Sequence, residues 1–146
     1  YNAQVNIDAV SSLFNKIGQG ILVTHSQSGG PGWRTAIINN NVKAIASFEP
    51  GGDFVFPEGA APDTIKLFGR TIVPPRVPMA DFMKLAKIPI IIYYGDNIPE
   101  QHSANPGQEQ WRVFLSVAKQ FRDAVNSRGG DVTLIHLPEI GIKGNT

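Results

Sequence analysis

Hydrophobic residues follow two alternating patterns along this chain, one typical of helices and the other of buried strands. Val10, Phe14 and Ile17 recur at helical spacing, which predicts a helix that ends near Gly18. The apolar run at residues 21–24 is short and uninterrupted, as in a parallel strand buried on both faces. This alternation of helix and strand continues along the chain and predicts an α/β fold.

Three more strands are predicted, at residues 42–48, 88–94 and 131–137. A second helix is expected around Trp33 and Ile37, ending at residues 39–41, with Pro31 tolerated near its first turn. Because helices separate the strands, the strands are expected to form a parallel sheet joined by right-handed crossovers.

A third helix carries clear signals at both ends. Asn105 is expected to cap it, with Pro106 at the first helical position and Gln108 placed for a capping box. Gly129 follows its last turn. Its apolar stripe is expected to face the core and consists of Trp111, Phe114, Leu115, Ala118, Phe121 and Val125.

Residues 53–87 fit neither a strand nor one long helix, because five prolines interrupt them. A long connection of this kind within a compact domain is usually functional. We expect residues 53–87 to form a lid or cap insert above the carboxyl ends of the strands, within one domain that spans residues 1–146. The alternative is a surface excursion without a part in catalysis.

The composition limits the classes of protein to which the chain can belong. Its 146 residues are 42% hydrophobic and 17% charged, as in an ordinary globular domain. A net charge of +1 provides no basic surface for nucleic acid or an anionic membrane. No apolar run approaches the ~20 residues that span a bilayer. The absence of cysteine excludes disulfides, thiolate nucleophiles and thiolate metal sites.

A serine between small residues follows the first predicted strand. Thr24, Ser26 and Ser28 form a small–x–Ser–x–small pattern, which is typical of a nucleophile elbow, G-x-S-x-G. The sharp turn strains the serine backbone and leaves the Ser26 hydroxyl pointing out above the sheet. The N–H of Gln27 is then expected to stabilise an oxyanion. A plain helix N-cap is the alternative role for Ser26.

The elbow and the order of elements resemble the carboxy-terminal half of an α/β-hydrolase, strands five to eight in the count of that family. Residues 24–29 together with residues 47–51 (Ser-Phe-Glu-Pro-Gly) resemble a group of mostly secreted bacterial and fungal esterases. In that group the acid of the catalytic triad is a Glu after the sixth strand. The resemblance covers nearly the whole chain and implies a three-layer α/β-hydrolase-like parallel sheet, of which only the last four strands are present.

The same resemblance implies a serine esterase that uses no metal and no organic cofactor. Ser26 would be the nucleophile and Glu49 the triad acid, with the N–H of Gln27 in the oxyanion hole. A small-molecule ester would be the substrate, and the location would be secreted or periplasmic. An amidase or lactonase on the same scaffold, a hydrolase-like binding protein and an inactive fragment are the alternatives.

The sequence itself favours Glu49 over the usual position of the acid. Most hydrolases of this fold place an Asp three residues after the Gly that ends the seventh strand, and counting from Gly95 gives Ile98. Asp96 lies only one residue after that Gly and is expected in a turn with Asn97. Glu49 follows the preceding strand directly, and its longer side chain covers the added distance. A solvated loop carboxylate is the alternative role for Glu49.

None of the three histidines is predicted to be the general base. His136 lies within the last strand and is expected to be packed there, whereas His102 belongs to a polar loop and is expected to be exposed. His25 occupies an x position of the elbow, where its ring is expected to support the turn. In this fold the catalytic His lies in the loop after the last strand, so we expect it just past Thr146.

The strands that precede the elbow in an α/β-hydrolase are expected upstream of Tyr1. We therefore expect the chain to be a fragment of a larger protein. Its partner would be the amino-terminal half of that same protein. The strand before Ser26 would then be an unpaired apolar edge, open to association. A half-size fold completed as a homodimer is the alternative.

Overall fold

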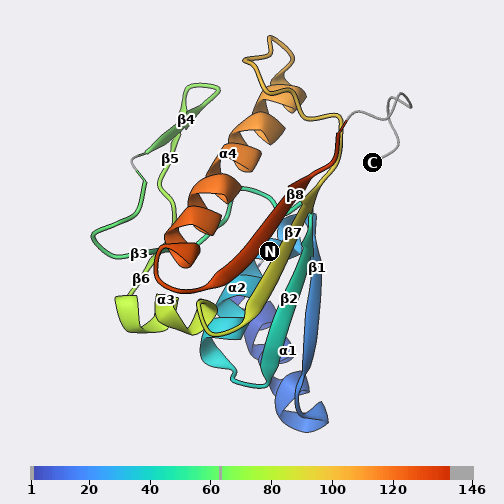
Figure 1. Ribbon diagram of the computed structural model, residues 1–146, viewed down its shortest axis with the longest axis vertical. Helices are drawn as coiled ribbons and strands as arrows, with labels where there is room; N and C mark the ends of the chain where they lie inside the picture. The colour runs from blue at the N-terminus through green and yellow to red at the C-terminus, as the bar shows by residue number, and fades with distance from the viewer. Residues whose placement is uncertain (1, 63, 139–146) are drawn as a thin grey trace.

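A four-stranded parallel sheet forms the centre of the protein (Figure 1). The computed structural model describes residues 2–62 and 64–138. The strands lie in the order β1-β2-β7-β8 and are β1 (Gly20–His25), β2 (Val42–Phe48), β7 (Pro89–Tyr94) and β8 (Asp131–His136). The helices are α1 (Ala3–Ile17), α2 (Gly29–Ile38), α3 (Met79–Leu85) and α4 (Pro106–Asn126), with a 3-10 turn η1 (Ser26–Ser28) before α2. The predicted parallel α/β fold is confirmed.

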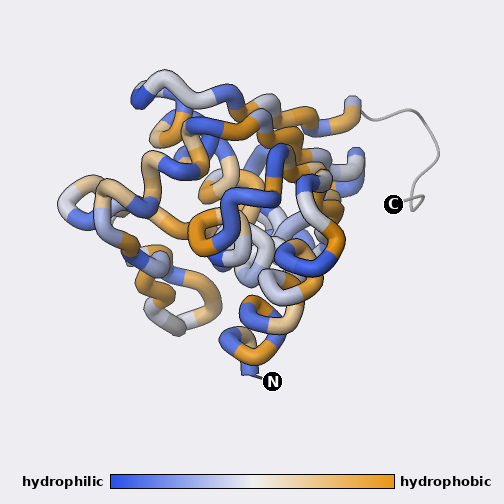
Figure 2. Tube along the Cα trace, turned by 90° about the horizontal axis from the view of Figure 1, so that it is seen from below, coloured by the Kyte–Doolittle hydropathy of each residue, from blue (hydrophilic) through white to orange (hydrophobic). Residues whose placement is uncertain are grey.

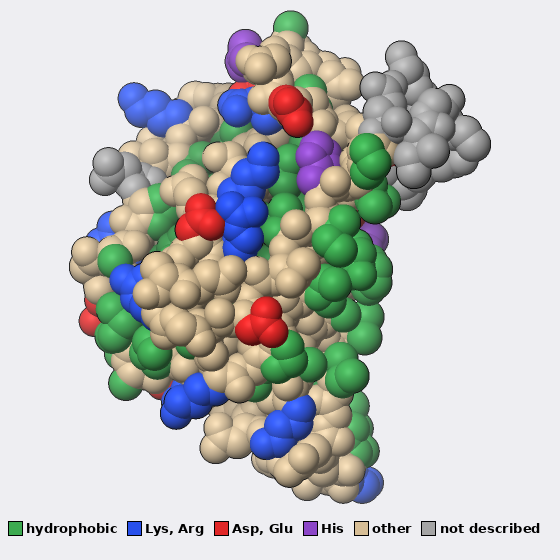
Figure 3. All heavy atoms as spheres, in the orientation of Figure 1, with side chains coloured by type: hydrophobic (Ala, Val, Ile, Leu, Met, Phe, Trp, Pro, Cys, Tyr) green, Lys and Arg blue, Asp and Glu red, His purple; other side chains and the backbone are tan. Residues whose placement is uncertain are grey.

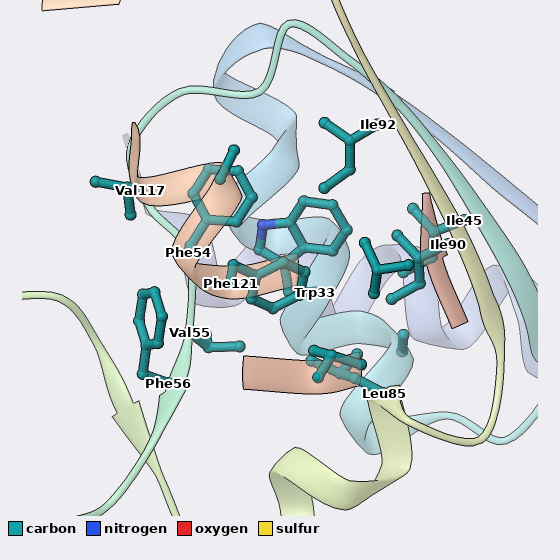
Figure 4. Close-up of a cluster of buried hydrophobic side chains, with 14 of the residues drawn as sticks. Trp33, Ile45, Phe54, Val55, Phe56, Leu85, Ile90, Ile92, Val117 and Phe121 are labelled. Carbon is teal, nitrogen blue, oxygen red and sulfur yellow. The ribbon is translucent and has the colours of Figure 1, made fainter. Parts of the chain in front are cut away.

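Helices α2, α3 and α4 lie on one face of the sheet, and α1 packs against α2 (Figure 1). Hydrophobic and hydrophilic positions follow one another closely along the trace (Figure 2), as expected for elements with one buried side. An aromatic group stands between the sheet and the helices. The rings of Trp33, Phe54 and Phe121 lie 5.1 to 5.5 Å apart between centroids and are fully buried (Figure 4).

The segment of residues 53–87 belongs to this core in part. Phe54 and Val55 are 0% exposed, and Phe82 of α3 packs edge-on against Phe121. The segment contains four short strands, β3 (Phe56–Pro57), β4 (Ile65–Leu67), β5 (Arg70–Ile72) and β6 (Arg76–Val77). Residues 54–56 are buried, so the start of the segment is part of the core, and the lid at residues 53–87 stays a prediction.

The opposite face of the sheet is apolar and carries none of these three helices. Ile21 and Val23 of β1 are 66% and 63% exposed, and Phe48 of β2 is 42% exposed. Figure 3 shows hydrophobic side chains gathered along the side of the molecule where the strands lie. β1 is an edge strand, as predicted. Parallel sheets normally bury both faces, so this face is one that globular proteins rarely leave in water.

The start of α4 confirms the predicted cap and corrects its detail. The side chain of Asn105 accepts hydrogen bonds from the N–H groups of Gly107 and Gln108, at 2.9 and 3.3 Å. Gln108 does not close a capping box with the Asn105 N–H. That N–H donates instead to the Ser103 hydroxyl, which itself donates to Gln108 Oε1. The Ser103 hydroxyl therefore bridges the Asn105 N–H and the Gln108 side chain, which in a capping box would bond directly.

Candidate active site

Ser26 and Glu49 stand at the same edge of the sheet because each follows the last residue of its strand. β1 and β2 are parallel and in register, with His25 opposite Phe48, and Phe48 is in turn opposite Tyr93 of β7. Ser26 follows the last residue of β1, and Glu49 follows the last residue of β2. Both lie at the carboxyl ends of the strands, where open α/β sheets bind their ligands.

The backbone of Ser26 has the strain that the elbow pattern predicts. Its φ is 52°, in the left-handed region that residues other than glycine rarely adopt. The chain turns there directly from β1 into η1, and the Ser26 side chain is half-buried. Such strain persists only where the surrounding structure enforces it, which makes Ser26 a candidate functional residue.

Tight packing between β1 and α2 enforces this turn. A Cβ added to Gly32 would lie 2.8 Å from Thr24 Cγ2, so the helix passes the strand too closely for any side chain at that position. The Thr24 hydroxyl cannot give way freely, because it donates to Ser47 Oγ at 2.8 Å inside the protein. A small residue at position 24 is therefore required by helix packing.

Two hydrogen bonds close the turn from the other side. The hydroxyl of Ser28 accepts from the His25 N–H at 2.9 Å and donates to the His25 carbonyl at 2.8 Å. The backbone of His25 thus supports the turn, whereas a role for its ring was predicted; the His25 residue itself is exposed. Ser28 therefore contributes its hydroxyl to the turn, as well as its small size.

The loop that carries Glu49 is packed directly against the Ser26 turn. A Cβ added to Gly29 would lie 2.7 Å from Pro50 Cβ, so the two segments meet without an intervening side chain. The N–H of Gly51 donates to the carbonyl of Ser26 at 3.2 Å. The two loops are therefore held together by direct packing and by a backbone hydrogen bond.

Glu49 also has a left-handed backbone, with φ of 45°. Its N–H donates to the Tyr93 carbonyl at 2.7 Å, and its Oε1 accepts from the Gly95 N–H at 3.0 Å. The carboxylate consequently reaches the carboxyl end of β7 and is held in one orientation. It lies at the carboxyl edge of the sheet and not at the opposite one.

Tyr94 is a further residue of this region that sequence reasoning did not single out. Its hydroxyl is buried and donates to the Pro50 carbonyl at 2.7 Å, anchoring the loop next to Glu49. Burial raises the pKa of Tyr94, and the negative charge of Glu49 raises it further. The hydroxyl therefore remains a donor at any ordinary pH. The only signal in the sequence was a tyrosine at the end of the most apolar strand.

Replacing Tyr94 by Phe should destabilise the protein by about 1–2 kcal/mol at pH 7, since the Pro50 carbonyl is left buried without a donor. The difference from wild type should narrow as the pH rises above about 10, because there the unfolded wild-type tyrosine ionises while the folded one keeps its proton. Urea unfolding of both proteins between pH 7 and 11 measures this. A difference that stays constant over this range would contradict it.

A hollow of about 420 Å³ opens beside Ser26, and we call it the serine hollow. Residues of the elbow, of the Glu49 loop and of α4 line it: Ser26, Gln27, Gly30, Pro31, Gly51, Gly52, Asp53, Gln110, Trp111 and Phe114. Gln27 is the second residue of η1, where helical N–H groups have no acceptor within the helix. Trp111 and Phe114 pack against the core, as predicted, and their half-buried rings also form a wall of this hollow.

Neither His102 nor His136 is among the residues that line the serine hollow. His102 is exposed, as predicted, and its Nδ1 lies 3.1 Å from Glu109 Oε1. His136 is half-buried at the end of β8, and it lines a second hollow, of about 600 Å³, together with Asp96. Asp96 lies in a turn with Asn97, as predicted. Its Oδ1 and His136 Nε2 have no hydrogen-bond partner among the described residues. The predicted position of the general base, past Thr146, lies outside the described residues.

Two classes of feature do not occur in the described part of the chain. Residues 2–62 and 64–138 contain no group of three or more His, Asp or Glu side chains that could hold a metal ion. In the same ranges, every helix is too short or too polar to cross a membrane.

Comparison with known proteins finds esterases among the solved structures of similar fold. Neither a protein-family model nor a curated protein matches the chain. A solved structure described as a novel bacterial esterase matches 94% of this chain and 34% of its own, at 29% identity and a TM-score of 0.65. A thermostable esterase matches 96% of this chain and 29% of its own, at 14% identity and a TM-score of 0.51. The chain therefore has a hydrolase-like fold shared with esterases, and it spans about a third of their length.

Proposed function

We propose that the protein is a serine hydrolase that acts on carboxylic esters, with Ser26 as nucleophile and Glu49 as triad acid. The observation that supports it best is the contact between the strained Ser26 turn and the loop of Glu49, at the carboxyl edge of the sheet. The likeness to esterases supports the same reaction.

In this mechanism a histidine located past Thr146, oriented by Glu49, takes the proton of the Ser26 hydroxyl. The serine oxygen attacks the ester carbonyl, and the N–H of Gln27 together with an N–H from upstream binds the resulting oxyanion. The alcohol leaves with the proton returned by the histidine. Water, activated by the same histidine, then releases the acid and restores the serine.

The full-length protein tests this proposal. It should hydrolyse p-nitrophenyl acetate, and a fluorophosphonate probe should label it at Ser26, as peptide mass spectrometry can locate. A full-length protein that is neither labelled nor active would exclude the esterase and favour a hydrolase-like binding protein.

We also propose that further parts of the same polypeptide cover the apolar face and the β1 edge of the sheet. Ile21 and Val23 lie on that face at the unpaired edge, and Phe48 continues it on β2. A parallel sheet requires cover on both faces, and the esterases of similar fold are about three times as long as this chain. Pairing with upstream strands would satisfy the edge N–H and C=O groups of β1.

Residues 1–146 produced alone should therefore bind a hydrophobic dye such as ANS and self-associate, because this face is exposed to water. The full-length protein should do neither. Dye fluorescence and light scattering of both proteins at equal concentration measure the difference. A monomeric 146-residue chain without dye binding would contradict this proposal and favour a face that tolerates water.

A further inference from the structure

A third and smaller hollow lies next to the serine hollow, and Ser26 is not among its lining residues. It has a volume of about 260 Å³ and lies between α4 and the hairpin of β4 and β5, which run side by side in Figure 1. The two hollows share Gly52, Asp53 and Phe114 as lining residues. The smaller one, which we call the hairpin hollow, therefore adjoins the serine hollow and lies close to the place where a ligand would react with Ser26.

The ring of Phe114 forms the wall between the two hollows and is held in place. A Cβ added to Gly52 would lie 2.6 Å from two carbon atoms of this ring, so the ring rests directly on the backbone of Gly52. Trp111 packs edge-on against its other side, with 5.5 Å between the ring centroids. The absence of a side chain at position 52 lets the Phe114 ring rest there, between the two hollows.

The hairpin hollow has an aliphatic lining. Ile65 and Ile72 face each other across the antiparallel hairpin, and Val117 of α4 closes the inner side. Asp53 is the only charged residue among the described residues of the lining, and its carboxylate stays half-exposed, 3.7 Å from Arg34. Such a lining favours an alkyl group and offers little to a polar one.

We infer that the hairpin hollow binds the alkyl chain of a medium-chain ester whose carbonyl lies at Ser26. The inference rests on the proposed function and adds the class of substrate to it. With about 30 Å³ for each methylene, as for a water molecule, the hollow accepts a chain of up to about eight carbons. Each buried methylene should increase kcat/KM by roughly threefold to fourfold.

The test uses the full-length protein and two half-buried positions of the hairpin, Ile65 and Ile72. Ile72→Trp and Ile65→Trp each fill the hollow from a different strand. Thr71→Trp is the matched control, because Thr71 is exposed and successive residues of a strand point to opposite faces. The measured quantity is kcat/KM for p-nitrophenyl octanoate divided by that for p-nitrophenyl acetate.

This ratio should fall at least tenfold in both isoleucine variants and stay within twofold in Thr71→Trp, while hydrolysis of acetate persists. A parallel series of alkyl acetates shows whether the chain belongs to the acid or to the alcohol of the ester. If both variants still hydrolyse acetate and the ratio is unchanged in both ester series, the inference about the hairpin hollow is wrong while the proposed function stands. An equal loss for short and long esters has the same meaning. Absence of acetate hydrolysis and fluorophosphonate labelling in the wild type overturns the proposed function as well.

Discussion

Replacing Ser26 by Ala should abolish ester hydrolysis, with a loss in kcat of at least about a thousandfold. Ser26 carries the only hydroxyl among the described residues that line the serine hollow, whose other side chains are amide, carboxylate, apolar or absent. Fluorophosphonate labelling should disappear in the same variant. Rates with p-nitrophenyl acetate and the mass of the labelled protein measure both effects.

The strained backbone provides a control that separates chemistry from folding. Alanine keeps the cost of a φ of 52°, so the free energy of unfolding of Ser26→Ala should stay close to that of wild type. Ser26→Gly removes the strain and should raise this free energy by about 1 kcal/mol while activity is equally absent. The exposed Ser116 on α4, changed to Ala, should leave both quantities unchanged. Activity retained in Ser26→Ala would contradict the assignment.

The sequence predicted the parallel sheet and the turn at Ser26 because both depend on local patterns. Apolar runs of strand length and the small residues around Ser26 act within a few positions of one another. The contact of Gly29 with Pro50 joins residues distant in the chain, and no pattern in the sequence reports it. The anchoring of Pro50 by Tyr94 is hidden for the same reason.

The aromatic residues of α4 have a role that periodicity alone does not report, because Trp111 and Phe114 pack against the core, as predicted, and also line the serine hollow. Trp111 and Phe114 share the helical spacing of the buried Phe121 and were therefore predicted to be in the core. The crossover from β7 places the first turns of α4 beside the carboxyl edge of the sheet, where these rings meet the serine hollow. The strands of residues 53–87 were missed because two or three residues are too few to show a period of two.

The second large effect concerns the acid of the proposed triad. Glu49→Gln should lower kcat by roughly 10³- to 10⁴-fold, because a neutral amide neither stabilises the imidazolium nor holds the required tautomer of the histidine. The fold should persist, since a glutamine oxygen can still accept the hydrogen bond from the Gly95 N–H. Circular dichroism and urea unfolding of the variant should match those of wild type.

Asp96→Asn is the matched control, since it removes a carboxylate at the end of the neighbouring strand. Asp96 Oδ1 has no partner among the described residues, so the amide disrupts no hydrogen bond there. Its kcat should stay within a few-fold of wild type. The opposite result, a large loss in Asp96→Asn and none in Glu49→Gln, would move the acid to the end of β7. Glu49 reaches the Gly95 N–H from β2, so its carboxylate already occupies the space beside that strand end, and we expect the first result.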